Sequence, residues 1–210
     1  MRKTVLSVAA LALLFLLAGC SSGNPSQTSE SAKPAAPKTP DALTGREVFQ
    51  KLYIAARGWT GDIKPFRLQS EPMPGVNGQD GKAAIWRASF ASPARRGLKT
   101  YLWSGTDEDG TSRGVTAGTE DTYNPNNRAT EIFDVAFLKT DSDKAFSVAQ
   151  QHGGEKITKA NPSQPVIYVL DWNPSENELI WHVIYGSSTS NTKLAVDVDA
   201  TTGAFLRVEK

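Results

Sequence analysis

The sequence predicts an α+β fold built from two tandem units, each an amphipathic helix followed by an antiparallel sheet. One observation is that each half of the chain begins with a helix pattern and continues with strand-like runs separated by turn residues. A second is that two of these runs align, because residues 85–90 and 180–185 both start with an Ile-Trp pair. The predicted units cover residues 41–125 and 126–210, and together they are large enough to share one core.

The first helix is expected to begin after Thr44. Thr44 and Glu47, three residues later, have the spacing of a capping box, and Gly58 is expected to end the helix. The apolar face of this helix consists of Val48, Phe49, Leu52, Ala55 and Ala56. The strands predicted after it lie at residues 85–90 and 98–103.

The second helix is expected to begin at Thr140 or Asp141 and to end at Gly153-Gly154. Its predicted buried face consists of Ala145, Val148, Ala149 and His152. The strands predicted after it lie at residues 166–172, 180–185 and 194–199. Gly203 has the conformational freedom that a tight turn needs, so the chain is expected to end in a β-hairpin with Asp197 and Asp199 on its solvent face.

The aligned strands place apolar side chains on equivalent faces, as expected for strands that pack against a helix. These residues are Trp86, Ala88 and Phe90 in the first half and Trp181, Val183 and Tyr185 in the second. An internal duplication accounts for the match. The alternative is a chance resemblance between two β-rich segments.

The second half ends in Val-Asp-Ala-x-x-Gly at residues 198–203, after the helix pattern at 143–149, Gly153-Gly154 and Trp181. Together these features resemble the PepSY domain over roughly residues 141–209. The resemblance implies a cystatin-like helix on an antiparallel sheet and a non-enzymatic role, either restraining peptidases or acting as a binding module. The first half departs from this motif, since residues 104–110 lack the Asp-Ala-x-x-Gly ending.

The N-terminal segment predicts export and lipidation. Arg2 and Lys3 precede an apolar run over residues 5–18 that is too short to span a bilayer, so residues 1–19 are predicted to be a signal peptide. Leu-Ala-Gly-Cys at 17–20 resembles the lipobox of bacterial lipoproteins, which implies acylation of Cys20, for example with palmitate. An ordinary secretory signal is the alternative, but it leaves the chain's one cysteine as a lone thiol.

These features together predict the location of the chain. Residues 20–40 are rich in Ser, Pro, Ala, Thr and Lys, so they are expected to form a disordered linker behind the lipidated cysteine. The lipid anchor at Cys20 would attach the chain to a membrane of the cell envelope. This is either the outer face of the cytoplasmic membrane or the outer membrane, facing the periplasm.

Composition argues against nucleic acid as a partner and against most enzyme classes. The chain has 23 Lys and Arg against 22 Asp and Glu and no basic stripe, so nothing is expected to neutralise a phosphate backbone. Its two histidines, His152 at a helix end and His182 in a strand, are expected to be structural. The sequence therefore predicts no catalytic residue, no cofactor and no enzyme activity.

No metal site is predicted either. The acidic run at 107–110 has the carboxylates that calcium favours, but it lacks the further ligands of an EF-hand, so a solvated turn between two strands is the preferred interpretation.

Aromatic residues are the best candidates for a binding surface. Most of the five tryptophans are expected in the core, whereas Tyr101, Trp103 and Trp172 are the ones expected to reach solvent. We expect the exported part to be a binding or inhibitory module that engages an envelope protein or peptide. A structural role in assembling an envelope complex is the alternative, and a cell-wall enzyme is a third hypothesis.

Overall fold

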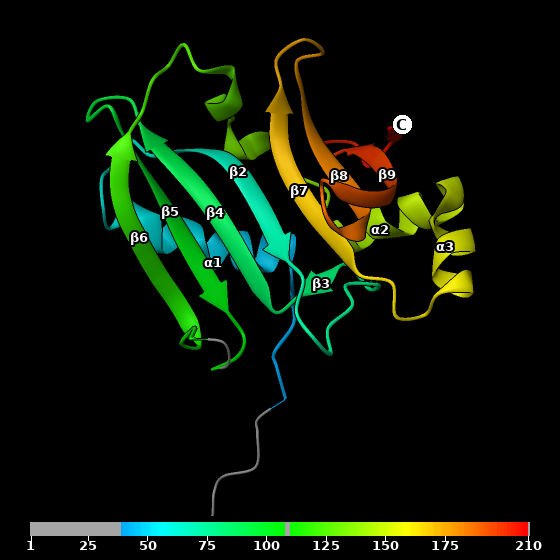
Figure 1. Cartoon of the computed structure of the whole chain (residues 1–210). Helices are drawn as coiled ribbons and strands as arrows, with labels where there is room; N and C mark the ends of the chain where they lie inside the picture. Colours follow the sequence, from blue (N-terminus) through cyan, green and yellow to red (C-terminus); the bar gives the residue numbers. More distant parts are fainter. Residues whose placement is uncertain (1–38, 108–109, 210) are drawn as a thin grey trace, which may run out of the picture. The chain divides into compact units, whose positions relative to one another are not determined.

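An eight-stranded antiparallel sheet forms the main layer of the structure, and the helices cover one of its faces (Figure 1). The computed structural model describes residues 39–107 and 110–209, which belong to one compact unit. The strand order is β10-β9-β8-β7-β2-β4-β5-β6. This combination of helices with an antiparallel sheet confirms the predicted α+β class.

The strands follow the chain as two consecutive meanders. The first comprises β2 (Lys64–Glu71), β4 (Ile85–Ser92), β5 (Gly97–Ser104) and β6 (Gly114–Thr122). The second comprises β7 (Val166–Asn173), β8 (Glu178–Ser188), β9 (Asn191–Asp199) and β10 (Phe205–Glu209). A separate short pair joins β1 (Leu43–Thr44) to β3 (Lys82–Ala83). The meanders meet where β2 pairs with β7, so the two halves share one continuous sheet.

Helix α1 (Gly45–Arg57) begins where the sequence predicts. The Thr44 backbone N–H donates to Glu47 Oε2 at 2.9 Å, which confirms that part of the capping box. The helix packs on the first meander through a face that includes Val48 and Leu52, both buried. This burial matches the spacing of apolar residues in its sequence.

Helix α2 (Ser142–Ala149) is capped by Asp141, one of the two predicted caps, but it is shorter than predicted. The chain continues through a π-type turn, Gln150–Gly154, and Gly153 has a φ of 112° that breaks the helix direction. A further helix that the sequence did not reveal, α3 (Glu155–Ala160), follows directly. Gly153 thus acts as a kink between helical segments, and the helical region does not end there. Two 3₁₀ turns, Arg128–Thr130 and Val135–Phe137, precede α2.

The core lies between the sheet and the helices, and the predicted strand faces are confirmed. Trp86 and Trp181 are fully buried, and their rings meet edge to face with centroids 6.4 Å apart. The Trp86 indole N–H donates to the Leu43 carbonyl at 3.1 Å, and that of Trp181 donates to the Thr140 carbonyl at 3.0 Å. Each carbonyl belongs to the residue immediately before a helix cap, so each tryptophan fixes the start of one helix.

The N-termini of α1 and α2 also bond to each other. Asp141 Oδ1 accepts from the Arg46 backbone N–H at 2.8 Å, and Asp141 Oδ2 accepts from the Thr44 hydroxyl at 2.8 Å. The Ser142 hydroxyl accepts from the Gly45 backbone N–H at 2.8 Å. The bonds from Gly45 and Arg46 satisfy backbone N–H groups that a helix leaves unpaired in its first turn.

Two strands of the main sheet, β2 and β6, were absent from the sequence prediction, as was the short β1–β3 pair. Strand β2 carries charged and polar residues on one face, and β6 is exposed along most of its length with few apolar residues. Neither has the run of β-branched and aromatic residues on which the prediction relied. Pairing with neighbouring strands, which the local sequence does not reveal, makes them part of the sheet.

The N-terminal predictions fall outside the described residues. These are the signal peptide at 1–19, the lipidated Cys20 and nearly all of the linker at 20–40. Within residues 39–107 and 110–209, no helix is both long and apolar enough to cross a bilayer.

Candidate functional site

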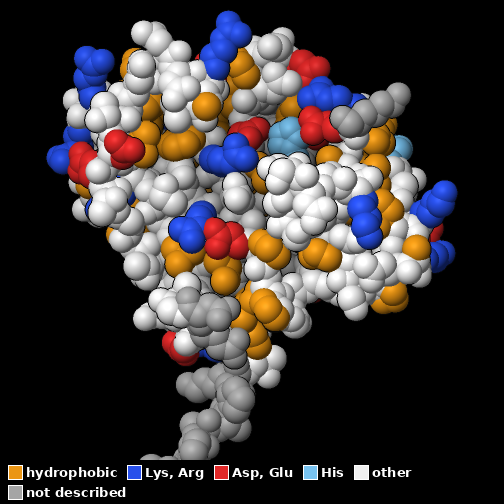
Figure 2. All heavy atoms as spheres, viewed as in Figure 1, with side chains coloured by type: hydrophobic (Ala, Val, Ile, Leu, Met, Phe, Trp, Pro, Cys, Tyr) orange, Lys and Arg blue, Asp and Glu red, His pale blue; other side chains and the backbone are white. Residues whose placement is uncertain are grey.

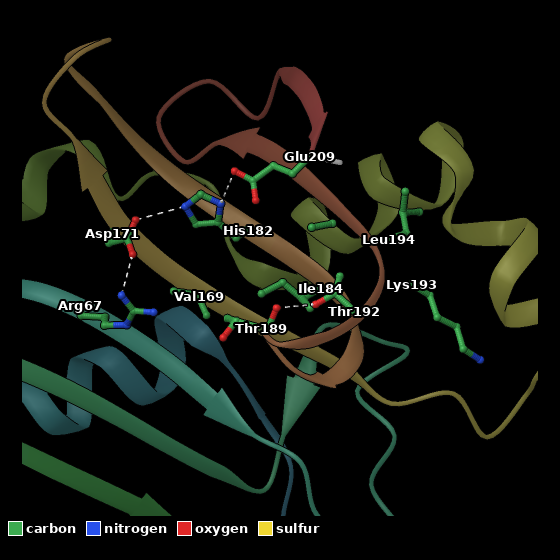
Figure 3. Close-up of a pocket in the computed structure, with 11 residues that line it drawn as sticks. Arg67, Val169, Asp171, His182, Ile184, Thr189, Thr192, Lys193, Leu194 and Glu209 are labelled. Atoms are coloured by element: carbon green, nitrogen blue, oxygen red, sulfur yellow. Dashed lines mark hydrogen bonds and ion pairs between the residues drawn. The ribbon is translucent and has the colours of Figure 1, made fainter. Parts of the chain in front are cut away.

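A groove with a volume of about 400 Å³ lies on the face of the sheet opposite the helices. It is formed mainly by β7, β8 and β9, with β2 contributing one side and β10 the other (Figure 3). Its lining residues are Arg67, Val169, Asp171, His182, Ile184, Thr189, Thr192, Lys193, Leu194, Ala195 and Glu209. The groove therefore draws on both halves of the chain, since Arg67 belongs to the first meander.

The floor of the groove is apolar. Val169, Ile184 and Ala195 lie on three neighbouring strands and form a small buried cluster together with Ile167. They project from this face because alternate residues of a strand point to opposite sides of the sheet. Their strand neighbours point to the helices, as Tyr168 does, so the sheet buries apolar side chains on both faces.

A row of alternating charges forms one edge of the groove. Arg67 Nη1 lies 3.0 Å from Asp171 Oδ2, and His182 Nε2 lies 3.1 Å from Asp171 Oδ1 (Figure 3). His182 Nδ1 lies 2.7 Å from Asp197 Oδ1. Acidic and basic side chains also gather around a histidine on the face shown in Figure 2.

The row continues onto β10. Arg207 Nε lies 2.9 Å from Asp197 Oδ2, and Arg207 Nη1 lies 2.6 Å from Glu176 Oε2. Asp197 is 0 % exposed, and its Oδ2 has no well-aligned hydrogen bond among the described residues, so its charge is balanced through the ion pair with Arg207. Glu209 Oε1 lies 3.9 Å from His182 Nδ1.

His182 is a cation at neutral pH. Burial lowers the pKa of its imidazole, but the hydrogen bonds and charges of Asp171 and Asp197 outweigh burial and raise the pKa to about 10. The protonated ring donates both of its N–H groups to these carboxylates. It therefore has no lone pair with which to accept a proton from a substrate.

The same protonation disfavours metal binding. His182, Asp197 and Glu209 each place a possible ligand atom within 4.8 Å of the others. A metal ion requires a neutral imidazole, and here it would compete with a proton held by two carboxylates. The arrangement favours a charge network over a metal centre.

No family model matches the chain, and no curated protein matches it in sequence. Among solved structures, it is similar to a candidate lipoprotein from Clostridium difficile, with a TM-score of 0.51 and 14% identity over 84% of this chain and 95% of that chain. The two proteins share a fold. At this identity the likeness extends to the fold alone, and the PepSY resemblance rests on the residues quoted from the sequence.

The predicted aromatic surface is not formed by the residues expected. Tyr101 and Trp103 are 3 % and 6 % exposed, so the expectation that they reach solvent is wrong. Both lie on the face of β5 that packs against α1, whereas alternate residues such as Leu102 face the other side. Trp172 is half-buried, with its ring centroid 5.2 Å from that of Phe137. A binding role for these residues stays a prediction that their burial does not favour.

The expectation that Asp197 lies on the solvent face of the last hairpin is also wrong. The hairpin itself is confirmed, since β9 pairs with β10 and Gly203 has a φ of 77°. Alternation correctly separates Asp197 from the apolar core face, but β10 and the side chains of His182 and Arg207 cover it. The sequence signal for this site was the presence of charged residues at alternate positions of the predicted strands. The register between the strands, which the sequence did not reveal, brings these charged side chains into contact.

The remaining candidates lie apart from the groove. The His152 ring stacks on Phe205 with centroids 3.7 Å apart. The acidic run at 107–110 falls between β5 and β6, but Glu108 and Asp109 are outside the described residues.

Proposed function

We propose that this chain is a lipid-anchored envelope protein whose folded part binds a ligand in the groove between β2 and β10. The observation that carries the proposal is the groove itself, which combines an apolar floor with a charged edge on a face that no helix covers. Its volume of about 400 Å³ is within the range of known small-molecule sites. The row of charges would orient a ligand bound on the otherwise apolar floor.

The anchor supports a location at the envelope membrane. The Leu-Ala-Gly-Cys segment at 17–20 has the lipobox pattern, and the structurally similar protein is itself described as a candidate lipoprotein. Acylation would hold the binding part beside the cytoplasmic membrane or, in the outer membrane, on the side facing the periplasm.

Binding without catalysis is the activity that the groove chemistry favours. Both ring nitrogens of His182 bond to carboxylates, and the Thr192 hydroxyl donates to the Ser188 carbonyl at 3.0 Å. His182 and Thr192 are thus engaged in bonds within the chain, which disfavours them as a general base and a nucleophile. We therefore expect recognition of an envelope protein or peptide, including restraint of a peptidase.

We also propose that the two halves are tandem copies of one helix-and-sheet unit. Trp86 and Trp181 occupy the second strand of their meanders, and each bonds to the carbonyl preceding its helix cap. An ancestral PepSY-like unit, duplicated and joined through β2 and β7, accounts for this correspondence.

Replacement of Cys20 tests the anchor. In cells fed labelled palmitate, we expect the wild-type protein to be labelled and to fractionate with membranes. Cys20→Ser should lose the label, while Ser21→Ala, a change of the adjacent residue, should retain it. Labelling that persists in Cys20→Ser would show that the lipid is attached elsewhere.

Blocking the groove tests binding. We expect native mass spectrometry of the full-length protein, purified from membranes in mild detergent, to detect a bound ligand. Thr192→Trp places a bulky ring at the groove and should abolish that mass difference. Thr116→Trp, on the exposed strand β6, is the matched control. A ligand retained equally by both variants, or absent from the wild-type protein, would refute groove binding.

A further inference from the structure

We propose that the groove binds a short peptide of two or three residues with both termini free, its ammonium group at Glu209 and its carboxylate at Arg67. This inference rests on the proposed binding function and specifies its ligand. It follows from three features of the groove: opposite charges at the ends of its edge, unused hydrogen-bonding capacity at both, and an apolar floor between the β2 and β10 sides.

The two ends of the groove's edge carry opposite charges. Arg67 extends from β2 and Glu209 from β10, while Asp171 and His182 lie between them (Figure 3). Asp171 and His182 contact each other at 3.1 Å, and each also contacts a further charged residue of the row, so neither offers a free charge to a ligand. A ligand along this edge therefore meets a cation at one end and an anion at the other, which complements a zwitterion of zero net charge.

Both terminal groups retain hydrogen-bonding capacity. Arg67 donates from Nε to Gln69 Oε1 at 3.2 Å and from Nη1 to Asp171 at 3.0 Å, and no described residue accepts from its Nη2. Glu209 makes no hydrogen bond to a described side chain, its nearest charged partner being His182 at 3.9 Å. A guanidinium offers five N–H donors and a carboxylate several acceptor positions, so each can take one end of a peptide.

The spacing sets the length of the ligand. One carboxylate and one imidazole ring separate Arg67 from Glu209 along the row. Two or three extended residues span about 7 to 10 Å, which is enough to pass one carboxylate and one imidazole ring. A single amino acid spans only about 3.5 Å, which is less than the three successive contacts that lead from Arg67 to Glu209.

The floor adds a preference for aliphatic side chains. Val169 and Ile184 lie below the charged edge and leave room for a side chain but no polar partner for it. A free anion such as phosphate fits less well, because it has no cationic group to place at Glu209. A bare metal ion must displace the proton of His182.

Calorimetry on the full-length protein in detergent tests the ligand class. The probes are alanyl-leucine and alanyl-leucyl-alanine, each with free ends, with an N-acetyl group, or with a C-terminal amide. We expect the free peptides to bind and each blocked form to bind about tenfold more weakly, because it loses a charge-assisted contact.

Two variants that each remove one charge test which end of the peptide binds at Glu209 and which binds at Arg67. In Glu209→Gln, acetylation of the peptide should no longer weaken binding, while amidation still should. In Arg67→Gln the pattern should reverse. Glu71→Gln and Arg87→Gln are matched controls, since this ion pair joins β2 to β4 and lies outside the groove lining, and they should bind like the wild-type protein.

Other outcomes overturn the inference. These are free peptides that fail to bind at about 1 mM, blocked peptides that bind as well as free ones, or variants that do not discriminate between the two ends. A different molecule found in the groove by native mass spectrometry would refute the peptide assignment and leave the proposed binding function standing. If native mass spectrometry finds no ligand on the wild-type protein, or finds one that Thr192→Trp does not displace, both the peptide assignment and the proposed binding function are refuted.

Discussion

A buried carboxylate such as Asp197 requires compensation, because removing a charge from water costs several kcal/mol unless partners replace the solvent. His182 and Arg207 supply two cations, one for each oxygen of this carboxylate. Asp171 performs a similar role on the other side of the His182 ring. We therefore expect the network to be most stable while His182 keeps its proton.

His182→Gln should destabilise the fold in a pH-dependent way. The pKa of His182 is raised from 6.5 to about 10 in the folded chain, so its contribution is fully present below pH 6.5 and disappears as the pH rises through about 10. We expect a loss of about 2 to 3 kcal/mol at pH 6, since the side chain is 19 % exposed and less costly to disrupt than a fully buried pair.

Urea unfolding at pH 6, 8 and 10.5 checks this prediction. The difference between the variant and the wild-type protein should shrink at the highest pH. His152→Gln is the control, because its ring stacks on Phe205 and makes no ion pair with a described residue. A pH-independent difference for His182→Gln would mean that packing, and not charge, explains its role.

At the scale of elements, the start of α1 illustrates how packing overrides helix propensity. Gly45 is buried in the first turn, and a Cβ there would lie 2.5 Å from Cη2 of Trp181. Trp181 is itself fully buried, so its ring has little room to move. Glycine is required here by the close approach of the helix to the tryptophan.

Gly45→Ala should therefore reduce stability. Alanine in a helix is favoured over glycine by up to about 1 kcal/mol, but overpacking against a buried ring costs about 1 to 3 kcal/mol. We expect a net loss of about 1 kcal/mol or more in thermal or urea unfolding. Gly61→Ala, where a Cβ meets nothing within 4 Å, should be nearly neutral. A stabilised Gly45→Ala would show that the ring moves aside.

At the scale of the whole folded unit, the two halves are joined in three ways. β2 and β7 pair through three residue pairs, the starts of α1 and α2 exchange hydrogen bonds, and one hydrophobic cluster contains residues of both halves. Trp86 and Trp181 meet within that cluster. Separation would expose apolar surface and strand edges on both sides.

The fragment covering residues 126–210 should therefore not fold alone. Residues 39–210 should unfold in one cooperative transition, whereas the fragment should lack the near-ultraviolet circular dichroism of ordered tryptophans. Co-expression of residues 39–125 with the fragment should restore it. Two separate unfolding transitions would instead show that each half is an independent domain.

The sequence by itself determined the features that depend on neighbours along the chain. The cap of α1 at Thr44 follows from local spacing, and the cap of α2 was narrowed to two adjacent residues. Local spacing also predicts the inward faces of Trp86 and Trp181 and the hairpin at Gly203. These are set by backbone geometry and periodicity, which a short segment encodes completely.

Tertiary structure decided the rest. Strand β2 belongs to the sheet because of its partners, and Tyr101 is buried because α1 covers its face. The groove joins Arg67 to Asp171 and His182 to Asp197 through strand register. A shift of one residue would send these side chains to the opposite face, and only the paired strands fix that choice.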